Sequence, residues 1–478
     1  EPPAPCFSFG HTTAKVPAAP KNSLNTMKPL SALLPAVLAI FLAACQGQTA
    51  VVQPALAEAP YAADSGHLLV RCGALIDGKS EEVRQDVWVL IENGRFSRIG
   101  EDIEAGPETP VFDLSDHTCL PGLIEMHAHM LEDFEELTDL TAYYDYSFED
   151  YMTKGREFSK LSIDAGFTTA RNLAVYYGWA DRELRDLIDR GELIGPRMQA
   201  AGFYLTVPGG GGDVLEVGGN EEDIPAHLRL GVSRSPDEFR LHTHEAVAGG
   251  ADVIKVIASG AVLAYGGVPG EPEMTPEDLA AVVEVAHAAG LRVAAHAHGA
   301  QSIREAILAG ADTIEHATYL DDEGIRLAME NDVALVMDIG AGDWMIEAGR
   351  EQGWVEEFQR KVLETTQAQR ESFRRAYEAG ATLVYGTDVA IYPHGMQAMQ
   401  FPYMVEWGMT PMEAIQSATS VAARYMDWED RVGAVEPGLY ADLVAVRGDP
   451  LQDISILEQV DAVIKGGLVF KAPPGTTR

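Results

Sequence analysis

From Leu123 onward, the chain alternates short apolar segments with amphipathic segments, and this alternation constrains the fold more than any other feature. Each apolar segment has strand character, and each is expected to run parallel to the next. Strand–helix alternation of this length predicts an α/β fold, namely a (β/α)8 TIM-like barrel over residues 119–433. The expected strands are 123–126, 166–170, 197–205, 252–258, 292–296, 312–316, 333–338 and 381–385.

Several of the intervening helices are marked by clear start or stop signals. Helix 235–248 begins with Ser-Pro-Asp-Glu, a sequence typical of a helix amino terminus. A long helical region ends at Ala379-Gly380, where glycine is suited to stop a helix. The other expected helices are 181–193, 275–289, 302–309, 322–330 and 411–425.

The segments on either side of the barrel have strand character without helical periodicity. In residues 67–118, Asn93-Gly94 separates two apolar runs, which is a strong hairpin signal. Alternating apolar residues return in residues 434–471. Because chain termini often lie close together in a domain, both ends are expected to build one small β-sandwich.

The amino terminus has the features of an export signal. Residues 1–26 precede the first methionine and are interpreted as an upstream extension. Residues 27–45 combine a basic start, a short apolar run and Leu-Ala-Ala-Cys45, which resembles a bacterial lipobox. Plain signal cleavage with an incidental cysteine is the alternative. The expectation is an exported protein, lipid-anchored in the outer membrane or periplasm of a Gram-negative bacterium, with residues 46–66 as a flexible tether.

Charge and cysteine usage exclude several classes of protein. A net charge of −38 argues against nucleic acid and against anionic lipid surfaces, so contact with a membrane is expected only through the lipid anchor. The four cysteines show no Cys-x-x-Cys spacing, so neither a zinc ribbon nor a disulfide scaffold is expected. Cys72 and Cys119 would be able to pair in an oxidising compartment, but two buried thiols are the favoured expectation. A homo-oligomer is left open.

Metal-type residues fall at the carboxyl ends of five expected strands, where barrel enzymes carry their active sites. The pairs His127-x-His129 and His296-x-His298 each point one way from a strand, because side chains two apart share a side. Lys255 lies inside an apolar strand, where an unpaired ammonium is costly. Carbamylation by CO₂ would convert it into an anionic oxygen ligand. The candidate metal ligands are His127, His129, Lys255, His296, His316 and Asp388.

These residues, with segments 252–266, 295–299 and 436–444, resemble the amidohydrolase superfamily. The likeness covers residues 67–469 and is greatest to its Xaa-Pro dipeptidase (prolidase-like) and imidazolonepropionase-related branch, which includes carboxypeptidase-like and ochratoxin-amidase-like enzymes. The resemblance implies two divalent ions bridged by Lys255, carboxylated by CO₂, and by a hydroxide that attacks the scissile carbonyl. Nitrogen and oxygen ligands suit zinc, although manganese or cobalt also fit.

The resemblance implies cleavage of an amide bond in a small molecule or short peptide, either a dipeptide or an N-acyl amino acid. Asp388 would act as the proton shuttle, Tyr265 would bind the carbonyl oxygen or pack on the barrel rim, and His298 would support the metal or the substrate. A cyclic amide hydrolase is the alternative, and a non-catalytic metal-binding lipoprotein is a distant one. The sequence departs from the family pattern at Asn172, Gln397 and Gln400, which weakens any transfer of substrate.

Overall fold

The computed structural model describes residues 66–133, 143–218 and 220–474 of the chain. The expected signal segment with Cys45, and nearly all of the expected tether, lie outside these described residues. Within the described ranges, no helix combines the length and the apolar character that a membrane crossing requires.

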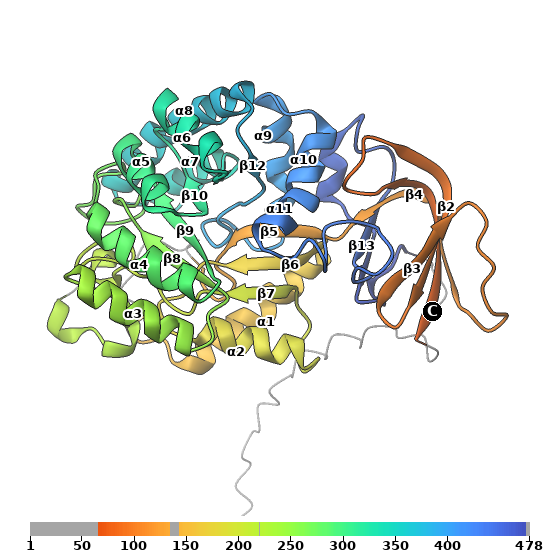
Figure 1. Cartoon of the computed structure of the whole chain (residues 1–478), viewed down its shortest axis with the longest axis horizontal. Helices are drawn as coiled ribbons and strands as arrows, with labels where there is room; N and C mark the ends of the chain where they lie inside the picture. The colour runs from red at the N-terminus through yellow and green to blue at the C-terminus, as the bar shows by residue number, and fades with distance from the viewer. Residues whose placement is uncertain (1–65, 134–142, 219, 475–478) are drawn as a thin grey trace, which may run out of the picture. The chain divides into compact units, whose positions relative to one another are not determined.

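Eight parallel strands form the centre of the main domain (Figure 1). They fall into a three-stranded sheet of order β5-β6-β7 and a five-stranded sheet of order β12-β11-β10-β9-β8. The strands are β5 (Leu123–Ala128), β6 (Phe167–Asn172), β7 (Arg197–Ala200), β8 (Val253–Ile257), β9 (Arg292–Ala297), β10 (Thr313–His316), β11 (Ala334–Val336) and β12 (Leu383–Val384).

Isolated bridges join the two sheets at both seams. Leu205, beyond β7, pairs in parallel with Val256 of β8, and Ala128 of β5 pairs in parallel with Val389, beyond β12. The eight strands therefore follow one another around a ring in chain order, which confirms the predicted (β/α)8 barrel. Every residue of β5, β6 and β8 is buried, as expected for strands covered on both faces.

Helices follow the strands, and the amino terminus of α3 is capped as its Ser-Pro-Asp-Glu sequence predicted. Ser235 caps α3 by accepting a hydrogen bond from the Glu238 amide, with proline in the first turn. Thr275 and Asp278 form a reciprocal capping box at α4. The helices are α1 (Phe148–Asp164), α2 (Ala180–Asp189), α3 (Pro236–Ala248), α4 (Pro276–Ala288), α5 (Ala300–Ala309), α6 (Asp322–Glu330), α7 (Ala341–Glu351), α8 (Glu356–Ala379), α9 (Gln400–Glu406), α10 (Pro411–Ser417) and α11 (Ser420–Tyr425).

The single helix predicted over residues 411–425 is wrong, because it is broken into α10 and α11. Thr419 leaves the helical region, with φ −136° and ψ −101°. The break turns two carbonyls toward the barrel: Ile124 donates to Ala418, and Tyr385 donates to Ser417. In an unbroken helix, these two carbonyls would instead accept hydrogen bonds from amides of the helix. Helices α1 and α9 were not predicted from the sequence.

The two ends of the described chain form one seven-stranded sheet, in the order β15-β14-β13-β4-β1-β2-β3. Figure 1 shows β13, in blue, beside β4, in orange, and the two strands pair antiparallel. Both halves of the sheet contribute to one apolar core, as expected for the predicted sandwich, but hydrogen bonds make the sheet continuous. Its strands are β1 (His67–Ile76), β2 (Val83–Glu92), β3 (Arg95–Gly100), β4 (Val111–Pro121), β13 (Leu443–Val446), β14 (Ala462–Lys465) and β15 (Leu468–Lys471).

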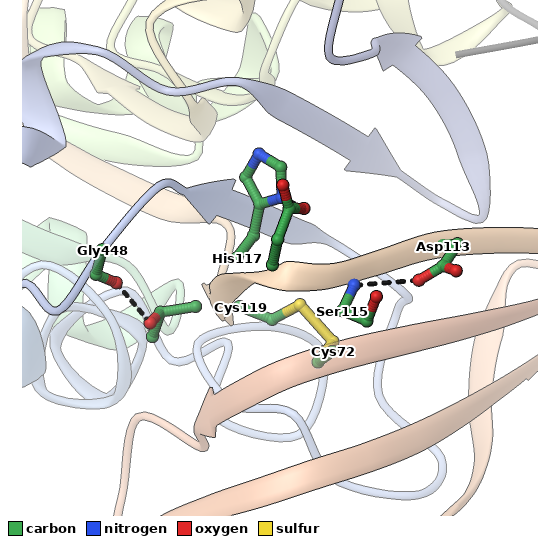
Figure 2. Close-up of a disulfide and its surroundings, with 8 residues drawn as sticks. Cys72, Asp113, Ser115, His117, Cys119 and Gly448 are labelled. Atoms are coloured by element: carbon green, nitrogen blue, oxygen red, sulfur yellow. Dashed lines mark hydrogen bonds and ion pairs between the residues drawn. A yellow bond between two sulfur atoms is a disulfide. The ribbon is translucent and has the colours of Figure 1, made fainter.

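A disulfide joins Cys72 of β1 to Cys119 of β4, so the expectation of two free thiols is wrong (Figure 2). The two strands are parallel neighbours, and a register irregularity between Cys72 and Ala74 shifts their pairing. The Cα atoms lie 5.9 Å apart, within the range that a disulfide spans. Sequence spacing carried no sign of this pairing, because the bulge that creates it depends on strand register.

Candidate metal centre

The predicted metal ligands lie together at the carboxyl ends of the barrel strands. Their side chains come from the ends of β5, β9 and β10, from the middle of β8 and from the segment after β12. All are buried, with exposed fractions between 1% and 8%. One pocket is lined by the complete set: His127, His129, Lys255, His296, His316 and Asp388.

A first group of ligand atoms converges on Asp388. Its Oδ1 lies 3.3 Å from Nε2 of His127 and 3.2 Å from Nε2 of His129. Two ligands on one tetrahedral zinc ion are about 3.4 Å apart, given Zn–N distances of about 2.1 Å. The observed spacing therefore fits atoms that share one ion. His316 extends this group, since its ligand atom lies within 4.8 Å of those of His127 and Asp388.

A second group consists of His296, His298 and His316, whose ligand atoms all lie within 4.8 Å of one another. The rings of His296 and His316 are 4.5 Å apart at a steep angle, and those of His298 and His316 are stacked. His298 lines the pocket, and its Nδ1 lies 2.7 Å from the Thr318 hydroxyl. It thus belongs to the same cluster as the two predicted ligands.

Oxygen atoms behind the histidines orient their rings. Nδ1 of His127 lies 2.9 Å from Glu315, and Nδ1 of His316 lies 2.9 Å from Asp338. Carboxylates in this position fix the tautomer and the direction of a metal-binding imidazole. Nε2 of His127 thereby faces the centre of the pocket.

Tyr204 and Glu132 orient His129, and sequence reasoning missed both. The Tyr204 hydroxyl donates to Glu132 at 3.0 Å and lies 3.0 Å from Nδ1 of His129. Glu132 is fully buried and also accepts a hydrogen bond from the Tyr176 amide. The available signal was the position of Tyr204 near the carboxyl end of the third expected strand.

Burial keeps most of the histidines in the form that binds metal. It lowers the pKa of His127, His296 and His298 well below the ordinary value, so their rings are neutral at physiological pH. At His316, burial acts in the same direction, but the carboxylate of Asp338 raises the pKa above its ordinary value. Neutral imidazole carries the free lone pair that a metal ion requires.

Lys255 lies beside His127 in the pocket that both groups line. Its Nζ is 3.3 Å from Nε2 of His127, and the side chain is 1% exposed. Burial lowers the pKa of Lys255 to about 8, because the charged ammonium loses its hydration. The Lys255 nitrogen is thus a buried, uncommonly acidic amine in direct contact with one of the predicted ligands.

Glu125 ties two ligand-bearing segments together and was not predicted as a site residue. Its Oε1 accepts hydrogen bonds from the amides of His127 and Thr387, each at 2.9 Å, and its Oε2 accepts from the Thr387 hydroxyl at 2.7 Å. Burial raises the pKa of Glu125 to about 8. The carboxyl group of Glu125 therefore fixes the backbone of β5 against Thr387, the residue that precedes Asp388.

Two of the ligand residues have left-handed backbone conformations. The φ angles are 69° at His316 and 56° at Asp388. Such conformations in residues other than glycine cost roughly 1–3 kcal/mol and cluster at functional sites. At both positions, the strand end turns sharply to present the side chain to the pocket.

Tyr265 lies outside the described lining of the pocket, and its contact with the substrate carbonyl stays a prediction. Its side chain is 40% exposed. Its ring packs on Phe358 of α8, with 4.9 Å between centroids. This packing fits the rim position that was the alternative interpretation.

The three departures from the family pattern serve as backbone supports. Asn172 accepts a hydrogen bond from the Met130 amide, next to His129. Gln400 donates to the carbonyl of Gly386, just before Asp388. Gln397 accepts a hydrogen bond from the Gly395 amide and donates to the buried Ser162 hydroxyl of α1. None of the three is among the residues described as lining the pocket.

A parallel eight-stranded barrel with clustered histidines and an aspartate at its carboxyl end defines the class of metal-dependent barrel hydrolases. The model of the Amidohydrolase family matches residues 118–469, most of the chain. The chain belongs to this family, whose members generally bind divalent metals, and it is a hydrolase acting on amide bonds.

The chain is similar to ochratoxinase of Aspergillus niger, with 29% identity over 427 residues, covering 85% of this chain and 87% of the relative. It is also similar to the crystal structure of a Xaa-Pro dipeptidase with bound methionine in the active site, at 36% identity and a TM-score of 0.80. That match covers 85% of this chain and 100% of the other. The imidazolonepropionase of Streptomyces avermitilis is 24% identical over 385 residues, covering 75% of this chain and 80% of the relative.

Proposed function

We propose that this amidohydrolase cleaves the amide bond of a dipeptide or an N-acyl amino acid with the help of two divalent ions. The observation that carries the proposal is that two histidine groups, which share His316, line one pocket together with Asp388 and Lys255. Two similar proteins act on such bonds by name, a Xaa-Pro dipeptidase and an ochratoxinase.

The residues of the pocket divide between holding metal and handling protons. His127, His129 and Asp388 would hold one ion, and His296 and His316 the other, with Lys255 as a carboxylated bridge. The donor set of imidazole nitrogen and carboxylate oxygen fits zinc. When bound, such ions activate water and polarise the scissile carbonyl.

Asp388 has the geometry of the proton carrier. Its Oδ1 is within 3.3 Å of both His127 and His129, at the mouth of the barrel where a substrate amide must lie. In this proposal, the carboxylate takes a proton from the attacking water and delivers it to the departing nitrogen. The products are then a free amine and a carboxylate.

The test is to supply zinc and bicarbonate and to measure amine release from dipeptides, N-acyl amino acids and cyclic amides. Release of amino acid from the first two classes supports the proposal. Preference for a cyclic amide would instead support the alternative that the imidazolonepropionase relative favours. Tight metal binding with no turnover of any amide would favour a non-catalytic metal-binding protein.

Lysine carboxylation is tested separately through Lys255. Lys255→Ala removes the proposed bridge, so metal content should fall below two ions per chain and amide hydrolysis should be lost. Short carboxylic acids such as propionate should restore part of the activity, because they supply a carboxylate in the vacated space. Retention of two tightly bound ions and full activity would overturn the bridging role.

We also propose export and lipid attachment at Cys45. The apolar run before Leu-Ala-Ala-Cys45 supports this, and so does the buried Cys72–Cys119 disulfide, since disulfides persist in oxidising compartments. Mass spectrometry of the membrane fraction should find a lipid-modified amino terminus at Cys45. Unchanged membrane partitioning of Cys45→Ser, with the same mature mass apart from the substitution, would overturn this proposal.

A further inference from the structure

The loop after β8 forms one wall of the substrate pocket. Ala261, Val262 and Leu263 line the pocket directly. Val262 and Leu263 pack against the same apolar cluster that contains Met345 and Phe358. The chain then turns away from the pocket toward the surface of α8, so the position of this wall depends on what holds the turn.

Lys361 of α8 hydrogen-bonds to the backbone of that turn. Its side chain is 1% exposed, and its Nζ donates to the carbonyl of Ala264 at 2.7 Å. The same Nζ pairs with Glu357 at 2.9 Å, and Glu357 accepts a hydrogen bond from the Gly266 amide at 3.0 Å. Lys361 and Glu357, one turn apart on α8, thus hydrogen-bond to the backbone of the loop on both sides of Tyr265.

The packing of this region explains the arrangement only in part. The Glu357 side chain is 35% exposed, and an ion pair with a solvent-accessible partner adds little to stability, so folding energy alone does not require the pair. A buried ammonium does, however, require fixed polar partners. Lys361 therefore specifies where the carbonyl of Ala264 must lie, and with it the preceding apolar residues.

The pocket wall away from the metal centre is uncharged. Besides the predicted metal ligands, the described lining includes His298 and the carboxylate of Asp338, which contacts His316. The other described lining residues carry no ionised side chain. They are Tyr176, Tyr204, Gly211, Ile257, Ala261, Val262, Leu263, Met345 and Ile391. Apolar surface of this kind favours an uncharged, apolar group on the ligand and disfavours a charged one, which would lose its hydration there.

We propose that Lys361 is a positioning residue which, through Ala264, sets the apolar wall of residues 261–263, and that this wall selects substrates with an uncharged apolar group beside the scissile amide. The inference rests on the proposed amide hydrolysis, because it describes the specificity of the same pocket. Lys361 itself touches neither the metal ligands nor the pocket.

The first experiment compares substrates that differ in one side chain. Gly-Phe, Gly-Ala and Gly-Lys, with N-acetyl-phenylalanine, N-acetyl-alanine and N-acetyl-lysine, are assayed by release of the amino acid. Phe-Gly, Ala-Gly and Lys-Gly vary the other side of the amide. In at least one series, kcat/KM should be highest for phenylalanine and lowest for lysine. Equal or better turnover of the lysine substrates in every series would overturn the selectivity.

The second experiment uses Lys361→Met, which removes the contacts of the ammonium with Ala264 and Glu357 but keeps an apolar side chain. Its matched control is Arg360→Met, which removes an exposed cation paired with Glu364 on the same helix. In Lys361→Met, kcat/KM for the preferred phenylalanine substrate should fall about tenfold, mainly through KM, a loss typical of one impaired apolar contact. The alanine substrate and the metal content should be unchanged. An equal loss for both substrates, or no loss, would overturn the role of Lys361.

Hydrogen–deuterium exchange of residues 259–266 provides a readout without catalysis. Exchange should be faster in Lys361→Met than in Arg360→Met, because the loop loses its anchor. If the wild type releases no amino acid from any substrate, the proposed function fails. The inference is then decided by hydrogen–deuterium exchange and by calorimetry, which compares the affinity for N-acetyl-phenylalanine with that for N-acetyl-lysine. Unchanged exchange, or equal binding of both compounds, would overturn it on its own.

Discussion

Arg171 and Glu315 form a fully buried ion pair directly beneath the metal centre. The guanidinium of Arg171 donates to Oε1 of Glu315 at 2.8 Å, and the two residues are 1% and 0% exposed. The other oxygen of Glu315 lies 2.9 Å from Nδ1 of His127. Arg171 also donates to the carbonyl of Met126, the residue before His127. The pair therefore holds one predicted ligand through both its ring and its backbone.

Breaking this pair should weaken metal binding and stability together. Arg171→Met leaves the Glu315 carboxylate buried without its partner, which costs about 3–5 kcal/mol of unfolding free energy. Removing a residue that orients a metal ligand lowers metal affinity by roughly 10–100-fold. Chemical unfolding and competition with a chelator measure the two effects.

A double variant provides the control for the charge argument. Arg171→Met combined with Glu315→Gln removes both charges and should recover part of the lost stability, while metal affinity stays low. If the two substitutions destabilise the protein additively, the effect of Arg171 does not arise from the unpaired carboxylate.

The ligand set was predictable because a barrel brings residues at the ends of separate strands into one site. Parallel strands bring their carboxyl ends to one edge, so His127 and Asp388, far apart in sequence, were expected to lie in one site. Side-chain alternation then put His129 and His298 on the same side as their partners. The structure brings all of these residues into one pocket.

Other features depend on register and packing, which a single sequence does not encode locally. The pairing of Cys72 with Cys119 depends on a bulge between two strands. Arg171 and Glu315 each look like isolated charges in apolar strands until β6 and β10 face each other across the barrel. Tyr265 follows the right strand, but its ring packs on Phe358 of α8. None of these outcomes follows from periodicity or spacing.

Asp388→Asn should separate proton transfer from metal binding. Asparagine keeps the shape and one oxygen ligand but loses the proton-carrying carboxylate, so kcat for amides should fall by about 10²–10⁴-fold. Activated esters have good leaving groups and should lose less. Steady-state kinetics on matched amide and ester substrates, with metal analysis, make the comparison. Equal losses for both substrates would indicate a purely ligating role.

The disulfide should stabilise the sheet domain. Cys72 and Cys119 are 47 residues apart in sequence, and a loop of this size closed by a disulfide is stabilised by about 2–4 kcal/mol. The double variant Cys72→Ala/Cys119→Ala should unfold at lower denaturant concentration and should not respond to reductant, whereas the wild type should. Alkylation in denaturant without reductant tests the bond itself, since labelling of both cysteines in the wild type would show that it had not formed.

Glu273 should make stability depend on pH near neutrality. Its carboxylate lies in the loop after β8 and accepts a hydrogen bond from the Gly211 amide at 2.9 Å. Burial raises its pKa from 4.5 to about 7, so the folded state holds a proton that the unfolded state has released between these values. The free energy of unfolding therefore falls as the pH rises from about 5 to 7. Above that range, the ionised Glu273 side chain destabilises the folded state.

Glu273→Gln should remove this pH dependence while keeping an oxygen acceptor for Gly211. At pH 8 the variant should be more stable than the wild type by about 1–3 kcal/mol, from the linkage between pKa and unfolding free energy. At pH 5 both Glu273 and the amide are uncharged, so the two proteins should differ little. Chemical unfolding at both pH values measures the change, with Glu271→Gln as the control because Glu271 is exposed two residues away. A difference between wild type and Glu273→Gln that is the same at pH 5 and pH 8 would show that Glu273 does not titrate in this range.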